Sequence, residues 1–404
     1  MSPVCALVLY NLVLHKLAWH KLNLLSSAAL AAIWVYHTLA ARRGMPQVPD
    51  LSRPEFAVAG GSALPRVSIL VPARNEEEMI EAAVHSLLGI DYPDYELVVV
   101  DDRSEDATGA ILDELKAEFG ERLTVVHVRE LPARWLGKTH AMYEAAKIAT
   151  GNWLLFSDAD VVHAPDALRR AVRYAEQEQA AHLALMPKMQ AESVGERMMT
   201  MAFQAMFLFA NRPWKVRDPK ARDVVGVGAF NLIRREVYEK IGTFESMRLS
   251  VVDDMRLSQK VKQAGLPSRV AIGEGMLGVR WAVGARGVVR NLTKNFFAFL
   301  RYNLPLAVLA VFGTLWLNLG PWLGTAFSIG WARAGYATAL ACLFVVYIAM
   351  ARRTGTSAAY VWLHPAATLL MAYALLRSTV LTLARGGVVW RGTFYPLSEL
   401  KGNW

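Results

Sequence analysis

Apolar residues follow two patterns along the chain, long continuous runs near the ends and short runs in between. Residues 22–40 carry no charge, and a helix of this length, at about 1.5 Å per residue, crosses a hydrocarbon core of roughly 30 Å. A cleaved signal peptide is the alternative, but the run is too long for one and ends at Arg42-Arg43 without a small-residue cleavage pattern. We therefore expect a transmembrane anchor.

A second apolar region begins after residue 303. Its runs predict three more membrane-spanning helices, near 304–328, 332–351 and 359–383. The first of these contains Gly320-Pro321, which leaves a broken or re-entrant span open as an alternative.

Basic residues indicate how the chain is oriented in a membrane. Arg42 and Arg43 follow the first span, and Arg352 and Arg353 follow the third. The positive-inside rule then places the segment between the first and second spans in the cytoplasm, although the basic stretch at 15–21 argues weakly for the opposite orientation.

Between the apolar ends, β-rich runs alternate with helical spacing. The run Val67 to Val71 ends at Pro72, and helical spacing follows over 76–88; strands are then expected at 95–104 and 123–128, with a helix over 107–120 between them. This alternation predicts an α/β domain with a mostly parallel sheet covered by helices on both faces. Ligands bind such sheets beyond the carboxyl ends of the strands.

Paired acidic residues stand at the ends of the predicted strands. One pair includes Asp102, another is Asp158 and Asp160 in "FSDAD", and a third, Asp253 and Asp254, opens a helical pattern. Two carboxylates one residue apart can share a hard divalent cation such as magnesium or manganese. A solvated loop or a helix cap explains a single pair of this kind equally well.

"FSDAD" also fits a second template, in which Asp158 is the nucleophile of a phosphatase-type Asp-x-Asp motif. Such an enzyme is expected to open its domain on this strand. Here two strand and helix units come first and bring acids of their own, which favours the metal site.

Charge and cysteine content narrow the function further. The chain has 44 Lys and Arg against 35 Asp and Glu, a net charge of +9, which suits an anionic membrane surface. No aromatic and basic motif for nucleic acid accompanies this charge. The two cysteines, Cys5 and Cys342, lie in apolar segments and offer neither a disulfide framework nor a thiolate metal site.

The motifs "VPARNEE", "VVVDDRS", "FSDAD" and "VVDDMRLSQKVKQAG", in this order over about residues 66–302, resemble the pattern of glycosyltransferase family 2. "RWLGKTHA", the closing "WRGTFYPLSELK" and the membrane flanks are similar to the bacterial branch that glycosylates lipids, including hopanoid-associated, carotenoid and ceramide-type transferases. The resemblance implies a GT-A fold and an inverting transfer from a nucleotide-diphosphate sugar.

The resemblance also implies roles for individual residues. Carried over to this sequence, it places Pro72, Arg74, Asn75 and Glu76 beside the nucleotide base, Asp102 at the base or ribose, Asp158 near the ribose and sugar, Asp160 on the metal ion and Asp254 as the general base. Lys138, at the start of a helical stretch, could add a positive charge near the phosphates, or be a solvated surface lysine. Asp253 is expected on the acceptor side.

One motif departs from the family pattern. Polymerising members carry Gln-x-x-Arg-Trp, and the nearest match here, Leu277 to Trp281, has leucine in the first position. This weakens a processive polysaccharide synthase as an alternative. Arg280 and Trp281 are candidates for the acceptor site, and an ordinary strand end explains them equally well.

Residues 286–301 carry basic residues along one side of a helical pattern and apolar ones along the other, which predicts an interfacial helix, with a helix packed on the domain as the alternative. The closing motif of Trp390, Arg391 and Gly392 resembles a family motif and would return to the active site. Three C-terminal spans, however, would leave it on the opposite side of the membrane.

We expect the following division: N-terminal anchor 1–43, linker 44–65, catalytic domain 66–285, interfacial helix 286–303, transmembrane helices 304–384 and tail 385–404.

Together these features predict a glycosyltransferase of the bacterial inner membrane, with its catalytic domain facing the cytoplasm and a lipid as acceptor. Two alternatives remain, a processive polysaccharide synthase and a non-catalytic membrane scaffold or sugar-lipid transport component.

Overall fold

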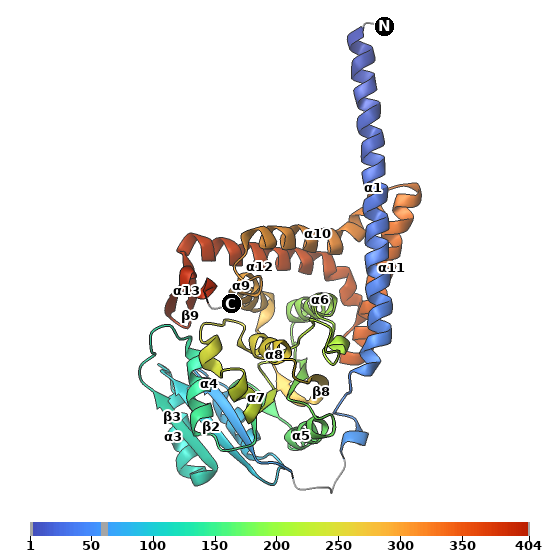
Figure 1. Cartoon of the computed structure of the whole chain (residues 1–404). Helices are drawn as coiled ribbons and strands as arrows, with labels where there is room; N and C mark the ends of the chain where they lie inside the picture. The colour runs from blue at the N-terminus through green and yellow to red at the C-terminus, as the bar shows by residue number, and fades with distance from the viewer. Residues whose placement is uncertain (1–2, 58–63, 403–404) are drawn as a thin grey trace.

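The computed structural model describes residues 3–57 and 64–402, with side chains from residue 15 onward. Residues 58–63 of the predicted linker, the side chain of Cys5 and the last two residues of the predicted tail lie outside what is described. Within the described residues, an α/β domain lies below a group of long apolar helices (Figure 1). The predicted fold class is confirmed.

One sheet forms the centre of the α/β domain, and its strands follow the order β3-β2-β1-β4-β7-β6-β8-β5. The strands are β1 (Val67–Ala73), β2 (Tyr95–Asp102), β3 (Leu123–Val128), β4 (Trp153–Phe156), β5 (Val162–His163), β6 (His182–Met189), β7 (Asn231–Arg234) and β8 (Ser268–Val279). β5 and β7 run antiparallel to their neighbours, and the other pairs are parallel.

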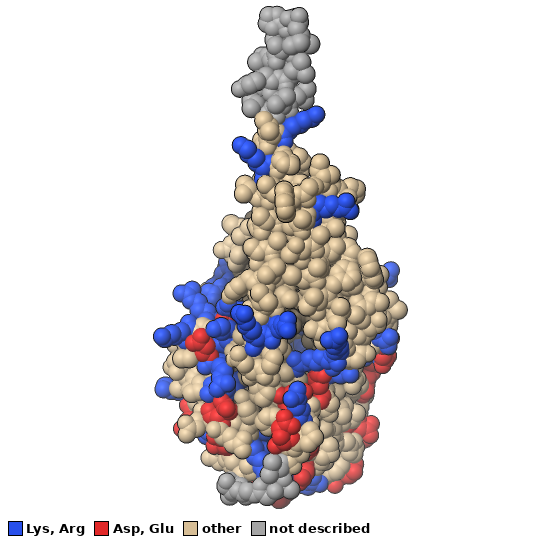
Figure 2. Space-filling model, turned by 90° about the vertical axis from the view of Figure 1, so that its right-hand side faces the viewer, with Lys and Arg blue, Asp and Glu red and all other residues tan. Residues whose placement is uncertain are grey.

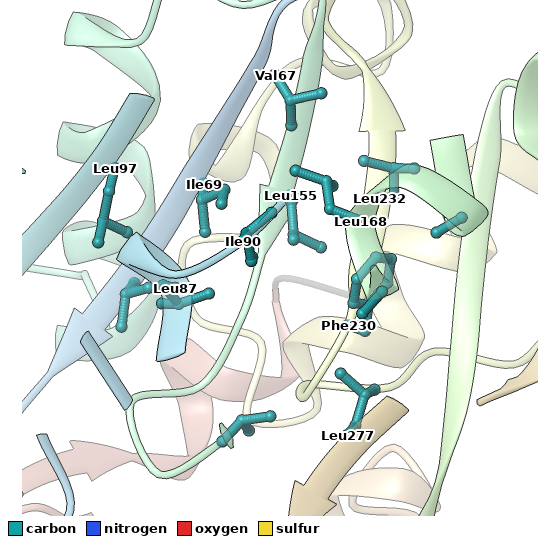
Figure 3. Close-up of a cluster of buried hydrophobic side chains, with 14 of the residues drawn as sticks. Val67, Ile69, Leu87, Ile90, Leu97, Leu155, Leu168, Phe230, Leu232 and Leu277 are labelled. Carbon is teal, nitrogen blue, oxygen red and sulfur yellow. The ribbon is translucent and has the colours of Figure 1, made fainter. Parts of the chain in front are cut away.

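Helices cover both faces of the sheet because its central strands are apolar on both sides. Along β1, Val67 and Ile69 contribute to one core cluster (Figure 3). Leu70 contributes to the other, as the alternation of side chains in a strand requires. One cluster is completed by α2 (Ile80–Leu88), α3 (Thr108–Phe119) and α5 (Ala167–Gln177), and the other by α4 (Gly137–Ile148), α7 (Arg235–Lys240) and α8 (Asp253–Gln263).

Two details of the strand and linker predictions differ from the structure. β1 does not end before Pro72 but continues to Ala73, and its pairing with β4 already stops at Leu70. Pro72 lacks an N–H group, but β1 makes no hydrogen bond to β4 at this position, so none is lost. The first half of the predicted linker is packed rather than free, because Leu51 is fully buried and its amide donates to the carbonyl oxygen of Ile272 in β8.

Four of the described helices are long and apolar enough to cross a membrane: α1 (Pro3–Gly44), α10 (Leu304–Phe327), α11 (Gly330–Thr354) and α12 (His364–Arg385). α10 continues through Pro321 and is not broken there. The proline cannot donate to Leu317, and the carbonyl oxygen of Leu317 instead accepts a hydrogen bond of 2.9 Å from Nε1 of Trp34 in α1.

The long helices form two groups with different directions (Figure 1). α1 and α11 lie side by side, while α10 and α12 run together across the top of the α/β domain. α12 leads into the antiparallel strands β9 (Gly387–Trp390) and β10 (Thr393–Pro396) and the short helix α13 (Leu397–Lys401). This tail lies beside the α/β domain.

The predicted interfacial helix is α9 (Gly284–Phe299), and one side of it packs on other helices. Val288 and Leu292 pack in one cluster with Met371 of α12 and Met199 of α6 (Val194–Ala210). The apolar side of α9, expected to meet acyl chains, therefore packs mainly on α6 and α12.

Candidate active site

Parallel strands bring acidic residues to one edge of the sheet. β1 is paired in parallel with both β2 and β4, so the carboxyl ends of the three strands are neighbours. Asp102 is the last residue of β2, and Asp158 and Asp160 follow β4. α8 begins with Asp253 and Asp254, and both line one small cavity with Asp158. The structure thus brings the second and third predicted acidic pairs together.

Lys138 lies among these carboxylates. Its Nζ is 2.7 Å from Oδ1 of Asp158 and 3.2 Å from Oδ2 of Asp253. Burial alone would lower the pKa of Lys138, but the charges of Asp158, Asp253 and Asp254 hold it above its usual value. Burial would likewise raise the pKa of Asp158, which the charge of Lys138 lowers instead. Lys138 therefore remains protonated and links the end of β4 to the start of α8.

The negative charges of Asp160 and Glu76 are balanced less well by nearby positive charge than those of Asp158 and Asp253. Burial and the charge of Asp158 raise the pKa of Asp160 to about 6, and burial and the charge of Asp160 raise the pKa of Glu76 to about 7. Carboxylates that repel one another in this way are suitable ligands for a divalent cation. No three His, Cys, Asp or Glu side chains among the described residues converge to hold a metal ion alone. A metal at Asp160 would thus need further ligands such as phosphate oxygens and water.

Asp254 has the properties of a proton acceptor. Its Oδ1 accepts a hydrogen bond of 2.7 Å from the amide of Met255, and it lines the small cavity with Asp158 and Asn231. Burial, and then the charge of Asp253, raises the pKa of Asp254 to about 6. A carboxylate with this pKa is ionised at neutral pH and is a stronger base than an ordinary aspartate.

Two glycines before β7 permit the close packing of this site, and the sequence analysis did not identify them. A Cβ atom on Gly228 would lie 2.4 Å from Oδ2 of Asp158, and one on Gly226 would lie 2.1 Å from the carbonyl oxygen of Asp254. Both distances are far below a van der Waals contact. The only signal in the sequence is a Gly-x-Gly pair in "GVGAF".

The turn after β1 packs against the end of β2. Arg74 is buried, with Nη1 4.0 Å from Oδ2 of Asp102, and Nε of Arg103 lies 2.8 Å from Oδ1 of the same carboxylate. Asn75 has a left-handed φ of 54°, and its Oδ1 accepts a hydrogen bond from the amide of Glu105. These contacts hold the predicted nucleotide-side residues in one rigid group.

Arg280 and Trp281 have different neighbours from the aspartates. Nη2 of Arg280 lies 2.9 Å from Glu192 and 3.3 Å from Glu196, and the ring of Trp281 lies 4.5 Å from that of Phe203 in α6. In the described part of the chain, these contacts join the end of β8 to α6.

Two basic residues outside the predicted site are directed into it. Nη2 of Arg391, in the tail, lies 3.7 Å from Oε1 of Glu76. Lys294 of α9, expected to face phosphate headgroups, has an exposed side chain, but partial desolvation and then the nearby charges of Lys138 and Arg391 lower its pKa. The tail therefore does reach the active site, while the position of Lys294 could not be read from its helical spacing.

Comparison with known proteins identifies the domain that carries most of these residues. The family model "Glycosyl transferase family 2" matches residues 68–242. This chain carries a glycosyltransferase family 2 domain. Asp253, Asp254 and the helices after them lie beyond the matched residues.

Relatives extend the similarity over most of the chain. The 4,4'-diaponeurosporenoate glycosyltransferase of Staphylococcus aureus (strain USA300) is 24% identical over 343 residues, which cover 82% of this chain and 89% of the relative. Among solved structures, the mannosyltransferase PcManGT from Pyrobaculum calidifontis, in complex with GDP-Man and Mn²⁺, has a TM-score of 0.53 and 20% identity. The match covers 89% of this chain and 99% of PcManGT, and it confirms the GT-A type of fold.

Proposed function

We propose that this glycosyltransferase moves a single sugar from a nucleotide-diphosphate sugar to a hydroxyl of a lipid acceptor, with inversion and with Mg²⁺ or Mn²⁺ bound. The observation that carries the proposal is the convergence of Lys138, Asp158, Asp160 and Asp254 at one edge of the sheet. Long apolar helices lie above this edge (Figure 1).

In this proposal, the end of β1 and Asp102 bind the nucleoside, and Asp160 binds the metal. Pro72, Arg74, Asn75 and Glu76 border the base, while Asp158 lies on the sugar side. A metal ion held by Asp160 would stabilise the negative charge that develops on the diphosphate as its bond to the sugar breaks. The structure of PcManGT with GDP-Man and Mn²⁺ supports this arrangement for a protein of the same fold.

Asp254 acts as the general base. Its carboxylate takes the proton of the acceptor hydroxyl, whose oxygen forms the new bond to the anomeric carbon while the bond from that carbon to the diphosphate breaks. Lys138 holds Asp158 and Asp253 in place around the cavity. Asp253 belongs to the acceptor side of the site, and we assign Arg280 and Trp281 to a more distant part of it, at the junction of β8 and α6.

A lipid acceptor is supported by the exposed apolar residues near the site. The outer side of α12 exposes Leu369, Tyr373, Leu376 and Val380, which follow one helical stripe. In Figure 2 a band without charged side chains crosses the molecule, with a few Lys and Arg side chains above it and many more below it. The name of the Staphylococcus aureus relative, a 4,4'-diaponeurosporenoate glycosyltransferase, agrees with an acceptor of this kind.

We further propose that the catalytic domain faces the cytoplasm from the inner membrane of a bacterium. The basic ends of α1 and α11 both lie on the side of the catalytic domain: Gly44 packs on Trp214, and Nε of Arg353 lies 2.8 Å from Oε1 of Glu274. Arg42, Arg43 and Arg352 belong to the same ends, as the positive-inside rule requires.

The experiment uses the full chain in lipid nanodiscs with bacterial lipid extract and labelled UDP- and GDP-sugars. We expect a lipid product that carries one added sugar, identified by mass spectrometry, and loss of this product in D160N and D254N. Products with many sugars would favour the processive synthase. Wild-type protein that binds no nucleotide sugar in the presence of Mn²⁺ would favour the non-catalytic scaffold, and full transfer by D160N or D254N would overturn the assigned roles.

A further inference from the structure

The tail ends its two-stranded sheet in a tight turn that is aimed at the active site. We call residues 387–396, which comprise β9 and β10, the C-terminal hairpin. Trp390 pairs with Thr393, so the loop consists of Arg391 and Gly392 only, and both have positive φ, 48° and 81°. Two-residue hairpin loops favour such angles, but glycine, asparagine or aspartate usually occupies the first position. An arginine here adopts a backbone conformation that is unfavourable for any residue with a Cβ atom, which indicates a specific use for its side chain.

The C-terminal hairpin is attached firmly to the catalytic domain. Its inward residues Val388 and Tyr395 are buried in a cluster with Leu136, which directly precedes α4, and with Leu249, which precedes α8. The amide of Leu397 donates to the carbonyl oxygen of Gly386 and closes the base of the hairpin. The turn therefore has a defined position over the site.

The guanidinium of Arg391 has binding capacity that the protein leaves unused. Nη2 approaches Glu76 at 3.7 Å, but Nη1 is buried and has no hydrogen-bond partner among the described residues. The buried Nη1 of Arg74 also lacks one, and a Cβ atom on the adjacent Gly392 would lie only 4.0 Å from Nη2 of Arg74. Two buried donors without acceptors are unfavourable unless a ligand supplies the acceptors.

A second cation lies behind the turn. Nζ of Lys294 in α9 is 5.4 Å from the ring centre of Trp390, and its charge acts on Asp158. The charge of Arg391 acts on Glu76, Asp158 and Asp160 alike. The C-terminal hairpin and α9 thus bring positive charge to the place where we propose that Asp160 binds a metal.

We propose that Arg391 binds the diphosphate of the nucleotide sugar, with the C-terminal hairpin acting as a fixed cover over the donor and Lys294 as a supporting cation. The inference rests on the proposed function, because it requires a nucleoside diphosphate in this site. The planar guanidinium presents paired donors that match phosphate oxygens, whereas the pairing with Glu76 at 3.7 Å is too long for a hydrogen bond. A bound diphosphate would accept a hydrogen bond from Nη1 of Arg391. Arg391 would in turn neutralise part of the negative charge that the diphosphate keeps when one metal ion is bound.

The alternative is that Arg391 only compensates the charge of Glu76 and holds the turn in place. A double-mutant cycle separates the two possibilities. The variants are R391Q, E76Q and the double variant, and the probes are UDP and GDP with Mn²⁺, titrated by calorimetry into the full chain in nanodiscs. R385Q removes the same charge from an exposed position at the end of α12 and is the matched control.

We expect R391Q to weaken binding of the preferred nucleoside diphosphate about 10- to 100-fold in the wild-type background and in E76Q alike, with R391K intermediate and R385Q unchanged. An R391Q effect that disappears in the E76Q background, or an unchanged affinity of R391Q, would overturn the role of Arg391 and leave the proposed function intact. Wild-type protein that binds neither UDP nor GDP would overturn both.

A structural readout accompanies the binding data. Trypsin can cleave after Arg385 and after Arg391, and a glycine follows each of them. With UDP or GDP and Mn²⁺ bound, we expect slower release of the fragment that begins at Gly392 and unchanged cleavage after Arg385, measured by mass spectrometry. Equal cleavage rates at Arg391 with and without a nucleotide that binds would contradict a cover over the donor.

Discussion

At the scale of single residues, Lys138 divides the acidic residues of the site into two groups. It contacts Asp158 and Asp253 and compensates their charge. Asp160 and Glu76 lie outside these contacts; burial and then the charge of Asp158 raise the pKa of Asp160, and burial and then the charge of Asp160 raise the pKa of Glu76. Of the two aspartates in "FSDAD", Asp160 is therefore the one with charge left for a metal ion. A lysine at the start of α4 thus distinguishes two residues that the motif alone treats as equivalent.

The raised pKa of Asp254 predicts an unusual pH dependence of sugar transfer. Because its pKa is about 6, the carboxylate becomes protonated as the pH falls through about 6, and kcat should fall there rather than near pH 4. D254N should lower kcat by about 10²- to 10⁴-fold and D254E should retain the acidic limb of the profile. Steady-state rates between pH 4.5 and 8.5, at saturating Mn²⁺, test this.

Asp254 should lower the stability of the folded protein at the pH values at which it supports catalysis. A raised pKa in the folded state means that Asp254 contributes stability below its usual pKa and that this contribution is lost as the pH rises through about 6. D254N should therefore unfold at a higher temperature than the wild type at pH 8, and this difference should shrink at pH 5. A variant that loses both activity and stability at pH 8 would point to a structural role instead.

The repulsion around Asp160 predicts that a divalent cation stabilises the protein. A metal that binds only the folded state at about 100 times its Kd adds about 2.7 kcal/mol, which a thermal unfolding scan in detergent detects as a higher Tm. D160N should have a higher Tm than the wild type without metal, because one repelling charge is removed, and little response to Mn²⁺. A Tm increase with Mn²⁺ that is equal in D160N and the wild type would exclude Asp160 as a ligand.

At the scale of elements, the features that the sequence predicts well are local ones. The strands β1 and β2, the helix α2 between them and the acidic strand ends depend on apolar periodicity within about ten residues. They appear close to where the pattern places them, although α2 begins at Ile80 rather than at residue 76. The parallel sheet then brings Asp102 and Asp158 to one edge without any long-range information beyond strand order.

Contacts between distant segments could not be predicted in the same way. Glu76 and Arg391 meet through a hairpin whose position depends on the packing of Val388 and Tyr395. Lys294 lies on the predicted basic side of α9, which stays exposed, and the packing of the apolar side on α6 and α12 brings the charge of Lys294 near Asp158. Helical spacing gives the sides of a helix and does not say which neighbour covers each side.

The segment before β7 predicts different outcomes for two neighbouring glycines. In G228A the new methyl group meets the carboxylate of Asp158, a side-chain end that can move, so stability should change by less than about 1 kcal/mol and transfer should fall about 10- to 100-fold. In G226A the methyl group meets the backbone of Asp254, which cannot move without shifting α8, so the loss of stability should reach about 1–3 kcal/mol. Thermal unfolding and transfer rates of both variants, measured side by side, check this; a G228A protein with full activity would contradict it.

At the scale of the whole molecule, the position of the tail restricts the path of the chain through a membrane. The chain leaves the catalytic domain after α9, passes through α10, α11 and α12, and returns to the same side, where Arg391 meets Glu76. Three complete crossings would end on the opposite side. Either one or all three of these helices therefore do not cross completely. If it is one, we infer that it is α12, because α12 packs along α9 and Nη1 of its Arg377 donates to Oγ1 of Thr293.

This path predicts that the tail and the catalytic domain are accessible from the same side of the membrane. Single cysteines at Glu81 in the domain, Ser398 in the tail and Ile329 between α10 and α11, in a chain with Cys5 and Cys342 replaced by serine, report their sides through an impermeant maleimide. Glu81, Ser398 and Ile329 are suitable because their positions are exposed. Ser328, next to Ile329, accepts a hydrogen bond from Asn23, about 30 Å along α1 from its basic end.

We expect E81C and S398C to react in inverted vesicles and to be protected in intact cells, because both lie on the side of the basic helix ends. I329C should show the opposite behaviour. The transfer activity of each variant confirms that the site is intact before labelling. If S398C reacts from the same side as I329C, the tail lies across the membrane from the catalytic domain, and the contact between Arg391 and Glu76 does not exist in the membrane-bound enzyme.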